Sequence, residues 1–136
     1  MNNKKLNQLF LKYQLGKKRT YIDSVDDKYI ITDSYCIYLI NKDDLFLNPS
    51  KFKEVNIKHF LEKTPELEFK DSGIVKDKKY MIFKSESGEE KTINKELLTP
   101  FDLNKCTFKS SEDKREMLYI YSFGELVGAV LPIITY

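Results

Sequence analysis

The sequence ends in its most apolar stretch, Leu126-Val-Gly-Ala-Val-Leu-Pro-Ile-Ile-Thr-Tyr136. Chain ends usually fray, and an apolar strand at a sheet edge is an aggregation hazard, so such a segment has to be covered. The run from Leu126 to Ile134 is nine residues long, whereas a membrane-spanning helix needs about 20. It therefore predicts a closing sheet strand held by its neighbours, with Pro132 and Ile133 available to a partner groove.

Composition and charge indicate one folded domain, residues 1–136. Hydrophobic residues make up 41% of the chain and charged residues 32%, which is typical of globular proteins. Polar residues interrupt any signal-peptide core near the N-terminus, so we expect a soluble, cytoplasmic protein with no membrane partner. Residues 1–19 carry six basic side chains and no acid, and the remainder has 17 basic and 21 acidic residues, a net charge of −4. This asymmetry is typical of a nucleic-acid-facing arm on a neutral body.

The spacing of apolar residues predicts an α+β chain. A first helix follows from the buried stripe at helical spacing, and Gly16 is placed to end it. Residues 20–25, 28–33 and 35–40 are rich in Tyr, Ile, Val and Thr and predict an antiparallel meander. The stripe consists of Leu6, Leu9, Phe10 and Tyr13.

The second half predicts another short helix and more strands. Residues 94–103 fit a helix with Asn94 as its N-cap. Strands are expected at 73–77, at 78–93 as a hairpin around Ser87-Gly88, and at 105–111, 116–122 and 125–133. A short helix is expected to begin within 56–69 and to end near Pro65. The predicted architecture is two short helices packed on antiparallel sheets, with residues 48–91 as a possible insertion.

The sequence shows no set of residues typical of a catalytic or metal site. His59 is the single histidine, and it has neither the cysteines of a zinc site nor a nucleophile to activate. Asp33 and Asp102 are the only acids suggestive of a metal-dependent nuclease. Cys36 and Cys106 lie in strand-like segments and are expected to be small buried hydrophobes. We therefore predict a protein without catalytic residues, metal or cofactor, with an unrecognised enzyme as a minor alternative.

Two stretches resemble the bacterial DNA sliding clamps, the β-clamp processivity factors. "IITDSYCIYLI", residues 30–40, is similar to the strand–turn–strand segment that commonly carries "ATDGHRLA". Thr32 and Asp33 match, and Ser34 replaces the glycine. Residues 93–136 resemble the end of a clamp, with an "N-x-x-x-L-L" helix and a closing "LPI" strand that runs into Thr135-Tyr136. The resemblance covers roughly residues 3–41 and 93–136 and implies a clamp-like domain fold.

The resemblance also implies two kinds of site. Clamp helices offer cations to DNA phosphates without reading bases. The cations here are Lys4, Lys5, Lys12, Lys17, Lys18 and Arg19. A solvated lysine face is the alternative interpretation.

Clamps also hold partner peptides in a pocket whose two walls come from different domains. A single domain would accordingly have to associate head to tail to rebuild it. The alternative is that the matching residues are simply core strands. They are Thr32, Ser34, Tyr35, Cys36 and Ile37, and Val130, Leu131, Pro132 and Ile133.

Two classes of function follow from these observations. The first is a non-catalytic clamp-like protein that acts with duplex DNA or the replication machinery, either as a working clamp or as a phage-type accessory protein. The second is a protein–protein interaction module, or an inhibitor of a host factor, with no nucleic-acid role. Nine Tyr and nine Phe residues supply the anchor side chains that interfaces use.

Overall fold

The structure is a computed structural model that describes residues 1–134. Thr135 and Tyr136, the last part of the clamp-like match, lie outside the described residues. No helix within the described residues has the length and apolar character that crossing a membrane requires. Residues 1–134 form one α-helix and ten strands, so the α+β class is confirmed, with a larger share of sheet than expected.

The elements follow one another in a simple order. Up to Ile134, five short 3-10 helices, η1 to η5, occur in the connections between strands. The helix and strands are α1 (Asn3–Leu15), β1 (Tyr21–Val25), β2 (Lys28–Thr32), β3 (Cys36–Asn41), β4 (Lys53–Glu54), β5 (Leu67–Lys76), β6 (Tyr80–Ser85), β7 (Glu90–Asn94), β8 (Cys106–Ser110), β9 (Leu118–Ser122) and β10 (Glu125–Val130).

Helix α1 forms where the apolar spacing predicts it, and both of its ends are capped. The Asn2 side chain accepts a hydrogen bond from the Lys5 N–H at 3.0 Å, which satisfies one of the free donors of the first turn. Gly16 is the C-cap, but the left-handed residue is Lys17, with φ of 59°. The Lys18 N–H then bonds to the Tyr13 carbonyl at 2.9 Å, as in a Schellman motif.

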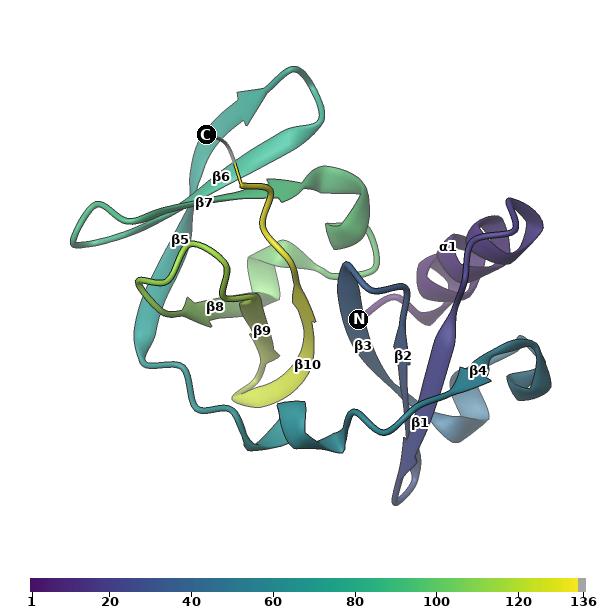
Figure 1. Ribbon diagram of the computed structural model, residues 1–136. Coiled ribbons are helices and arrows are strands. Elements are labelled where there is room, and N and C mark those ends of the chain that lie inside the picture. Colours follow the sequence, from purple (N-terminus) through teal and green to yellow (C-terminus); the bar gives the residue numbers. More distant parts are fainter. Residues whose placement is uncertain (135–136) are drawn as a thin grey trace.

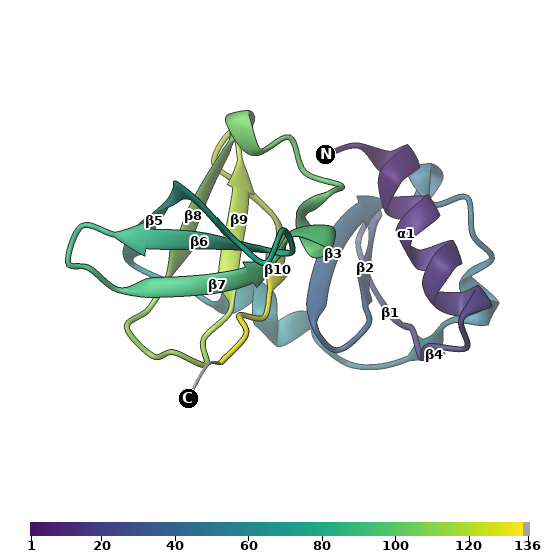
Figure 2. The ribbon, with the colours of Figure 1, turned by 90° about the horizontal axis from the view of Figure 1, so that it is seen from above.

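All ten strands belong to one sheet in the order β4-β1-β2-β3-β10-β9-β8-β5-β6-β7. Neighbours are antiparallel except for β1 and β4. The predicted meander of β1 to β3 is confirmed, as are the β6–β7 hairpin and the last three strands. Figures 1 and 2 show α1 beside β1–β3 at one end of the sheet and the longer hairpins at the other end.

The apolar C-terminal run first forms strand β10 and then continues beyond it to β7. Strand β10 ends at Val130, whereas the sequence predicts a strand as far as residue 133. The Leu131 N–H donates to the Tyr35 carbonyl, and the Ile133 N–H donates to the Thr92 carbonyl, both at 2.8 Å. The segment after β10 therefore lies beside β3 first and then reaches β7, the edge strand of the sheet.

One large core fills the space between α1, the inner face of the sheet and the segment after β7. Phe10 contacts the Tyr38 ring edge-on at 5.7 Å, and Tyr38 stacks on Phe101 at 5.4 Å. The outer face of β2, β3, β9 and β10 carries a smaller apolar cluster that includes Phe60. The helix stripe at Leu6, Leu9, Phe10 and Tyr13 is buried as predicted.

The middle of the chain and the second helix differ from the prediction. Residues 94–103 form no α-helix, because only Lys95–Leu98 takes up a 3-10 helix, η4. Pro100 supplies no N–H to extend it. The expected helix after residue 56 is the 3-10 helix η3, Lys58–Glu62. Residues 73–77 are not a separate strand but the end of the ten-residue strand β5.

Candidate functional site

A groove lies where α1, the β2–β3 turn, η4 and the C-terminal segment meet. It encloses about 510 Å³. It is lined by Tyr13, Tyr35 and the segment from Leu131 to Ile134. The Tyr35 side chain is 55% exposed. Leu97 from η4 completes an apolar surface that water reaches, which is the usual composition of a binding groove.

The structure brings the two predicted walls together within one chain. Val130 faces Cys36 and Ala129 faces Ile37 in the antiparallel β3–β10 ladder. That pairing places Tyr35 next to Leu131 at the end of the ladder. The two walls that the resemblance places in different domains of a clamp therefore lie side by side within this one chain.

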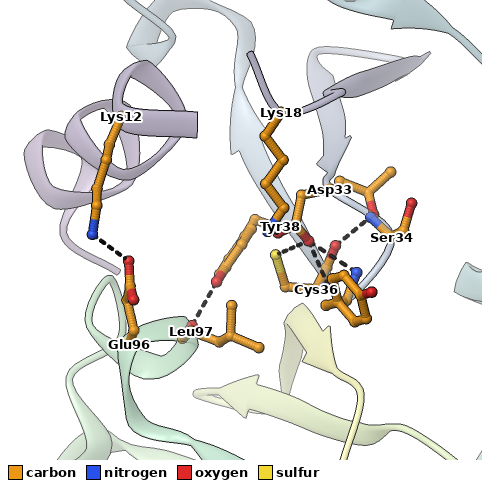
Figure 3. A network of polar contacts seen from close by, with 10 residues as sticks. Lys12, Lys18, Asp33, Ser34, Cys36, Tyr38, Glu96 and Leu97 are labelled. Atoms are coloured by element: carbon orange, nitrogen blue, oxygen red, sulfur yellow. Dashed lines mark hydrogen bonds and ion pairs between the residues drawn. The ribbon is translucent and has the colours of Figure 1, made fainter. Parts of the chain in front are cut away.

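The turn before β3 is organised by Asp33, whose side chain is fully buried. One carboxylate oxygen accepts hydrogen bonds from the backbone N–H groups of Tyr35 at 2.9 Å and Cys36 at 3.0 Å. The same oxygen lies 2.8 Å from the Cys36 Sγ. Ser34, between them, has φ of 85°, a conformation that glycine adopts without strain. Figure 3 shows Asp33 within this turn, between Lys18 and Cys36, and the turn leaves the Tyr35 side chain exposed.

Lys18 joins the end of α1 to this turn. Its Nζ lies 2.6 Å from the second Asp33 oxygen, and Figure 3 shows the side chain reaching across to the carboxylate. The ammonium also lies 4.2 Å from the centre of the Tyr13 ring and 5.3 Å from that of Tyr35, within cation–π range. These contacts with Asp33, Tyr13 and Tyr35 therefore hold the Lys18 side chain in the wall of the groove.

Glu96, the other charged residue in the groove, also has an ion-pair partner within the chain. The Lys12 Nζ lies 2.8 Å from a Glu96 carboxylate oxygen, and this pair connects α1 with η4. Burial first, and then the nearby Cys36 and Asp33, raise the pKa of Tyr13, so its phenol stays neutral at ordinary pH. The groove consequently offers apolar surface with little free charge.

The other predicted partner-binding residues do not line the groove. Thr32, Cys36 and Val130 are buried, in keeping with the alternative that they are core positions. Ser34 is exposed on the turn, and Ile37 packs against the smaller apolar cluster. The residues that do line it are Tyr35, Leu131, Pro132 and Ile133.

The six predicted DNA-binding cations divide into two sets. Lys12 and Lys18 are in the ion pairs just described. The other four are exposed, and none of them forms an ion pair among residues 1–134. Leu11 and Leu15 are exposed on the same helix. The four free cations are Lys4, Lys5, Lys17 and Arg19.

The titratable residues that sequence analysis considered for chemistry are dispersed. His59 is exposed on η3, away from the groove. Burial, and then the charge of Asp33, raise the pKa of the Cys36 thiol well above its ordinary value of 9.0. Cys106 is partly buried at the start of β8. Within the described part of the chain, no three His, Cys, Asp or Glu side chains are grouped to hold a metal ion.

Sequence reasoning missed half of the groove. Tyr13 belongs to the buried helix stripe, and its position in the last turn of α1, near the run of cations, was the available signal that it lines the groove. Asn94 was expected as a cap, and its side chain does accept from the Glu96 N–H at 3.0 Å. This cap begins η4, which carries Glu96 and Leu97. That these two residues line the groove is visible only in the tertiary structure.

Comparison of the chain with protein-family models, with curated proteins and with solved structures found no significant match.

Proposed function

We propose that this chain is a non-catalytic binding protein that holds an apolar segment of a protein chain in the groove between α1 and the C-terminal segment. The single observation that carries the proposal is that the exposed Tyr35 side chain and Leu131–Ile134 line one groove, whose two charged residues are already paired. Burying an aromatic or large aliphatic side chain contributes about 1.5–3 kcal/mol. An apolar anchor residue is therefore the ligand that this surface favours.

The charge pattern of the groove favours a neutral ligand over an acidic one. Lys18 and Glu96 each have an internal partner within 2.8 Å. A ligand carboxylate would have to displace Asp33 from Lys18, and Asp33 would then remain as a buried charge without its partner, which is costly. Binding at this groove should consequently change little with salt concentration.

Selection from a library of displayed random peptides tests this proposal. We expect enrichment of peptides with an aromatic or large aliphatic anchor, and affinity that changes less than roughly threefold between low and high salt. Tyr35→Ser should abolish the binding, whereas the same change at Tyr21, a half-buried position on β1 outside the groove, should not. Selected peptides that require several acids, or that bind Tyr35→Ser as well as the parent chain, would overturn the proposal.

A clamp-like role with duplex DNA is the second candidate. The observation in its favour is that Lys4, Lys5, Lys17 and Arg19 are exposed around α1 without an ion pair in the described residues. The positive φ of Ser34, at the position of the clamp glycine, supports the resemblance of the turn. The exposed Leu11 and Leu15 on the helix weigh against a phosphate-facing surface.

Salt titration of duplex DNA binding tests this candidate. Four phosphate contacts would give a slope of log affinity against log salt of about −3 to −4. Changing the four free cations to glutamine should remove the binding, whereas changing Lys109 and Lys114, which lie on and after β8, should leave it. If the chain binds no duplex DNA at low salt, the clamp-like role is contradicted. The groove then remains the proposed site of function.

A further inference from the structure

Phe123, at the turn between β9 and β10, is the most conspicuous apolar residue outside the core. Its side chain is 88% exposed, more than any other large hydrophobic residue in the described chain. Its φ is 51°, and the next residue, Gly124, has φ of 80°. A two-residue hairpin loop with both φ values positive is a type I′ turn, in which Asn-Gly is the favoured sequence. A bulky aromatic residue is strained there.

The exposed Phe123 ring contributes to no apolar cluster of the described chain. Asparagine at this position would relieve the backbone strain and remove the exposed ring without loss to the core. Strain and exposure of this kind persist where a residue serves a contact outside its own fold.

The turn and the groove lie at opposite ends of the same strand. Phe123 precedes β10, and Leu131 to Ile134 follow it. A strand of six residues separates the two sites by about 20 Å. Figure 1 shows the β9–β10 turn and the segment that follows β10 at opposite ends of that strand. Neither site can therefore serve the other within one molecule, but each is free to meet its counterpart on a second molecule.

The chemistry of the two sites is complementary. Two tyrosine rings, Tyr13 and Tyr35, line the groove, and aromatic rings pair favourably edge-to-face or offset. The charged residues of the groove, Lys18 and Glu96, are already paired within the chain. The groove therefore favours a neutral ring such as that of Phe123.

We propose that a second copy of this chain occupies the groove, with Phe123 of one molecule docked between Tyr35 and the C-terminal segment of the next. This inference rests on the proposed function, since it names the partner of the same groove. The contact is heterologous, because each molecule offers its turn at one end and its groove at the other. Association therefore continues beyond a dimer, into a ring if the rotation closes and into a filament if it does not.

Light scattering after size exclusion tests this assembly with two complementary variants. Phe123→Asn removes the anchor and places the favoured residue in the type I′ turn, so it folds at least as well as the parent chain. Tyr35→Ser removes part of the groove at an exposed position and keeps Phe123. We expect the parent chain to grow beyond a dimer with concentration, and each variant to be monomeric, with self-affinity weakened by roughly tenfold or more.

Mixing the two variants gives the decisive result. The groove of the Phe123→Asn chain and the turn of the Tyr35→Ser chain make one complete contact, so the mixture should form a heterodimer and stop there. Urea denaturation of each variant confirms that it is folded. A parent chain that stays monomeric up to near-millimolar concentration, or a mixture without a heterodimer, overturns the assembly. Peptide binding at the groove would then still stand, which separates failure of this inference from failure of the proposed function.

Discussion

At the scale of single residues, Asp33 links the end of α1, the β2–β3 turn and the groove. Its buried carboxylate is bonded to Lys18 on one oxygen and to Tyr35 and Cys36 backbone groups on the other. The sequence points to this aspartate through the Thr-Asp pair, but it does not reveal the partner. Lys18 was expected at a DNA surface because a run of cations is usually solvated, and only the fold shows that it turns toward Asp33.

Ser34 gives a prediction at the same scale. Its φ of 85° is unfavourable for any residue with a Cβ, so Ser34→Gly should raise the free energy of unfolding by about 0.5–1 kcal/mol, after the entropy lost by glycine is subtracted. Urea denaturation measures the change. The control Ser24→Gly, within β1, should lower the free energy of unfolding. Destabilisation by Ser34→Gly would mean that the turn does not hold this conformation.

At the scale of elements, Tyr38 joins β3 to η4. Its hydroxyl donates to the Leu97 carbonyl at 2.5 Å, and its side chain is fully buried. Tyr38→Phe keeps the ring but leaves that carbonyl without its partner, so the free energy of unfolding should fall by about 1–3 kcal/mol. Tyr21→Phe, at a half-buried position on β1, is the matched control and should change it by less than about 0.5 kcal/mol. Equal effects of the two changes would contradict this role of Tyr38.

Gly128 allows β10 to approach β3 and the segment after η4. A Cβ at this position would lie 2.6 Å from the Ile37 carbonyl oxygen and 2.8 Å from the Phe101 ring. Because a backbone atom cannot move aside cheaply, Gly128→Ala should lower the free energy of unfolding by about 1–3 kcal/mol. Gly16→Ala, at an ordinary φ of −81°, is the comparison and should be nearly neutral. A stable Gly128→Ala chain would show that the β3–β10 contact is looser than described.

The elements themselves were mostly predictable. Helix α1 and the strands from Tyr21 to Asn41 follow from residue spacing, and the last three strands follow from alternation bounded by turns. The prediction of a second α-helix was wrong because Asn94 caps a single 3-10 turn as readily as it would cap a longer helix. Strand β5 was missed in part because its exposed end carries Gly73 and many charges, which hide a strand pattern.

At the scale of the whole molecule, pairing between distant strands was not predictable. Strand β10 lies between β3 and β9, and β5 lies between β8 and β6. The sequence pattern does not predict that residues 131–134 reach β7. The contact consists of one isolated β-bridge between Ile133 and Thr92, which leaves no repeating pattern in the sequence. The groove depends on this closure. Four of its residues were named from the sequence, whereas Tyr13, Leu97 and the charge pairing at its rim were not.

The pH dependence of stability belongs to this scale as well. Burial raises the pKa of Cys36 above 9.0 and that of Tyr38 above 10.0. The stabilisation is complete below these values and is lost above them, because the unfolded chain ionises first. Burial lowers the pKa of Lys91, which opposes the trend, but more groups have raised values. The other raised values are those of Tyr13, Cys106, Tyr119 and Tyr121.

We therefore expect the free energy of unfolding to fall between pH 8 and pH 10, because the Cys36 thiol ionises in the unfolded chain before it does in the folded one. Urea denaturation at the two pH values measures the fall. Cys36→Ala, although less stable at both, should lose less across the interval than the parent chain does. A free energy of unfolding that stays constant or rises with pH would contradict the burial of these groups.

The central claim is that the groove between α1 and the C-terminal segment binds an apolar side chain. The most direct measurement is a titration of the isotope-labelled protein with N-acetyl-phenylalaninamide, followed by NMR of the backbone amides. We predict saturable shifts at Tyr13, Lys18, Tyr35, Leu97 and Leu131 that disappear in Tyr35→Ser. Shifts that are absent, or that gather on another face of the molecule, would contradict the account.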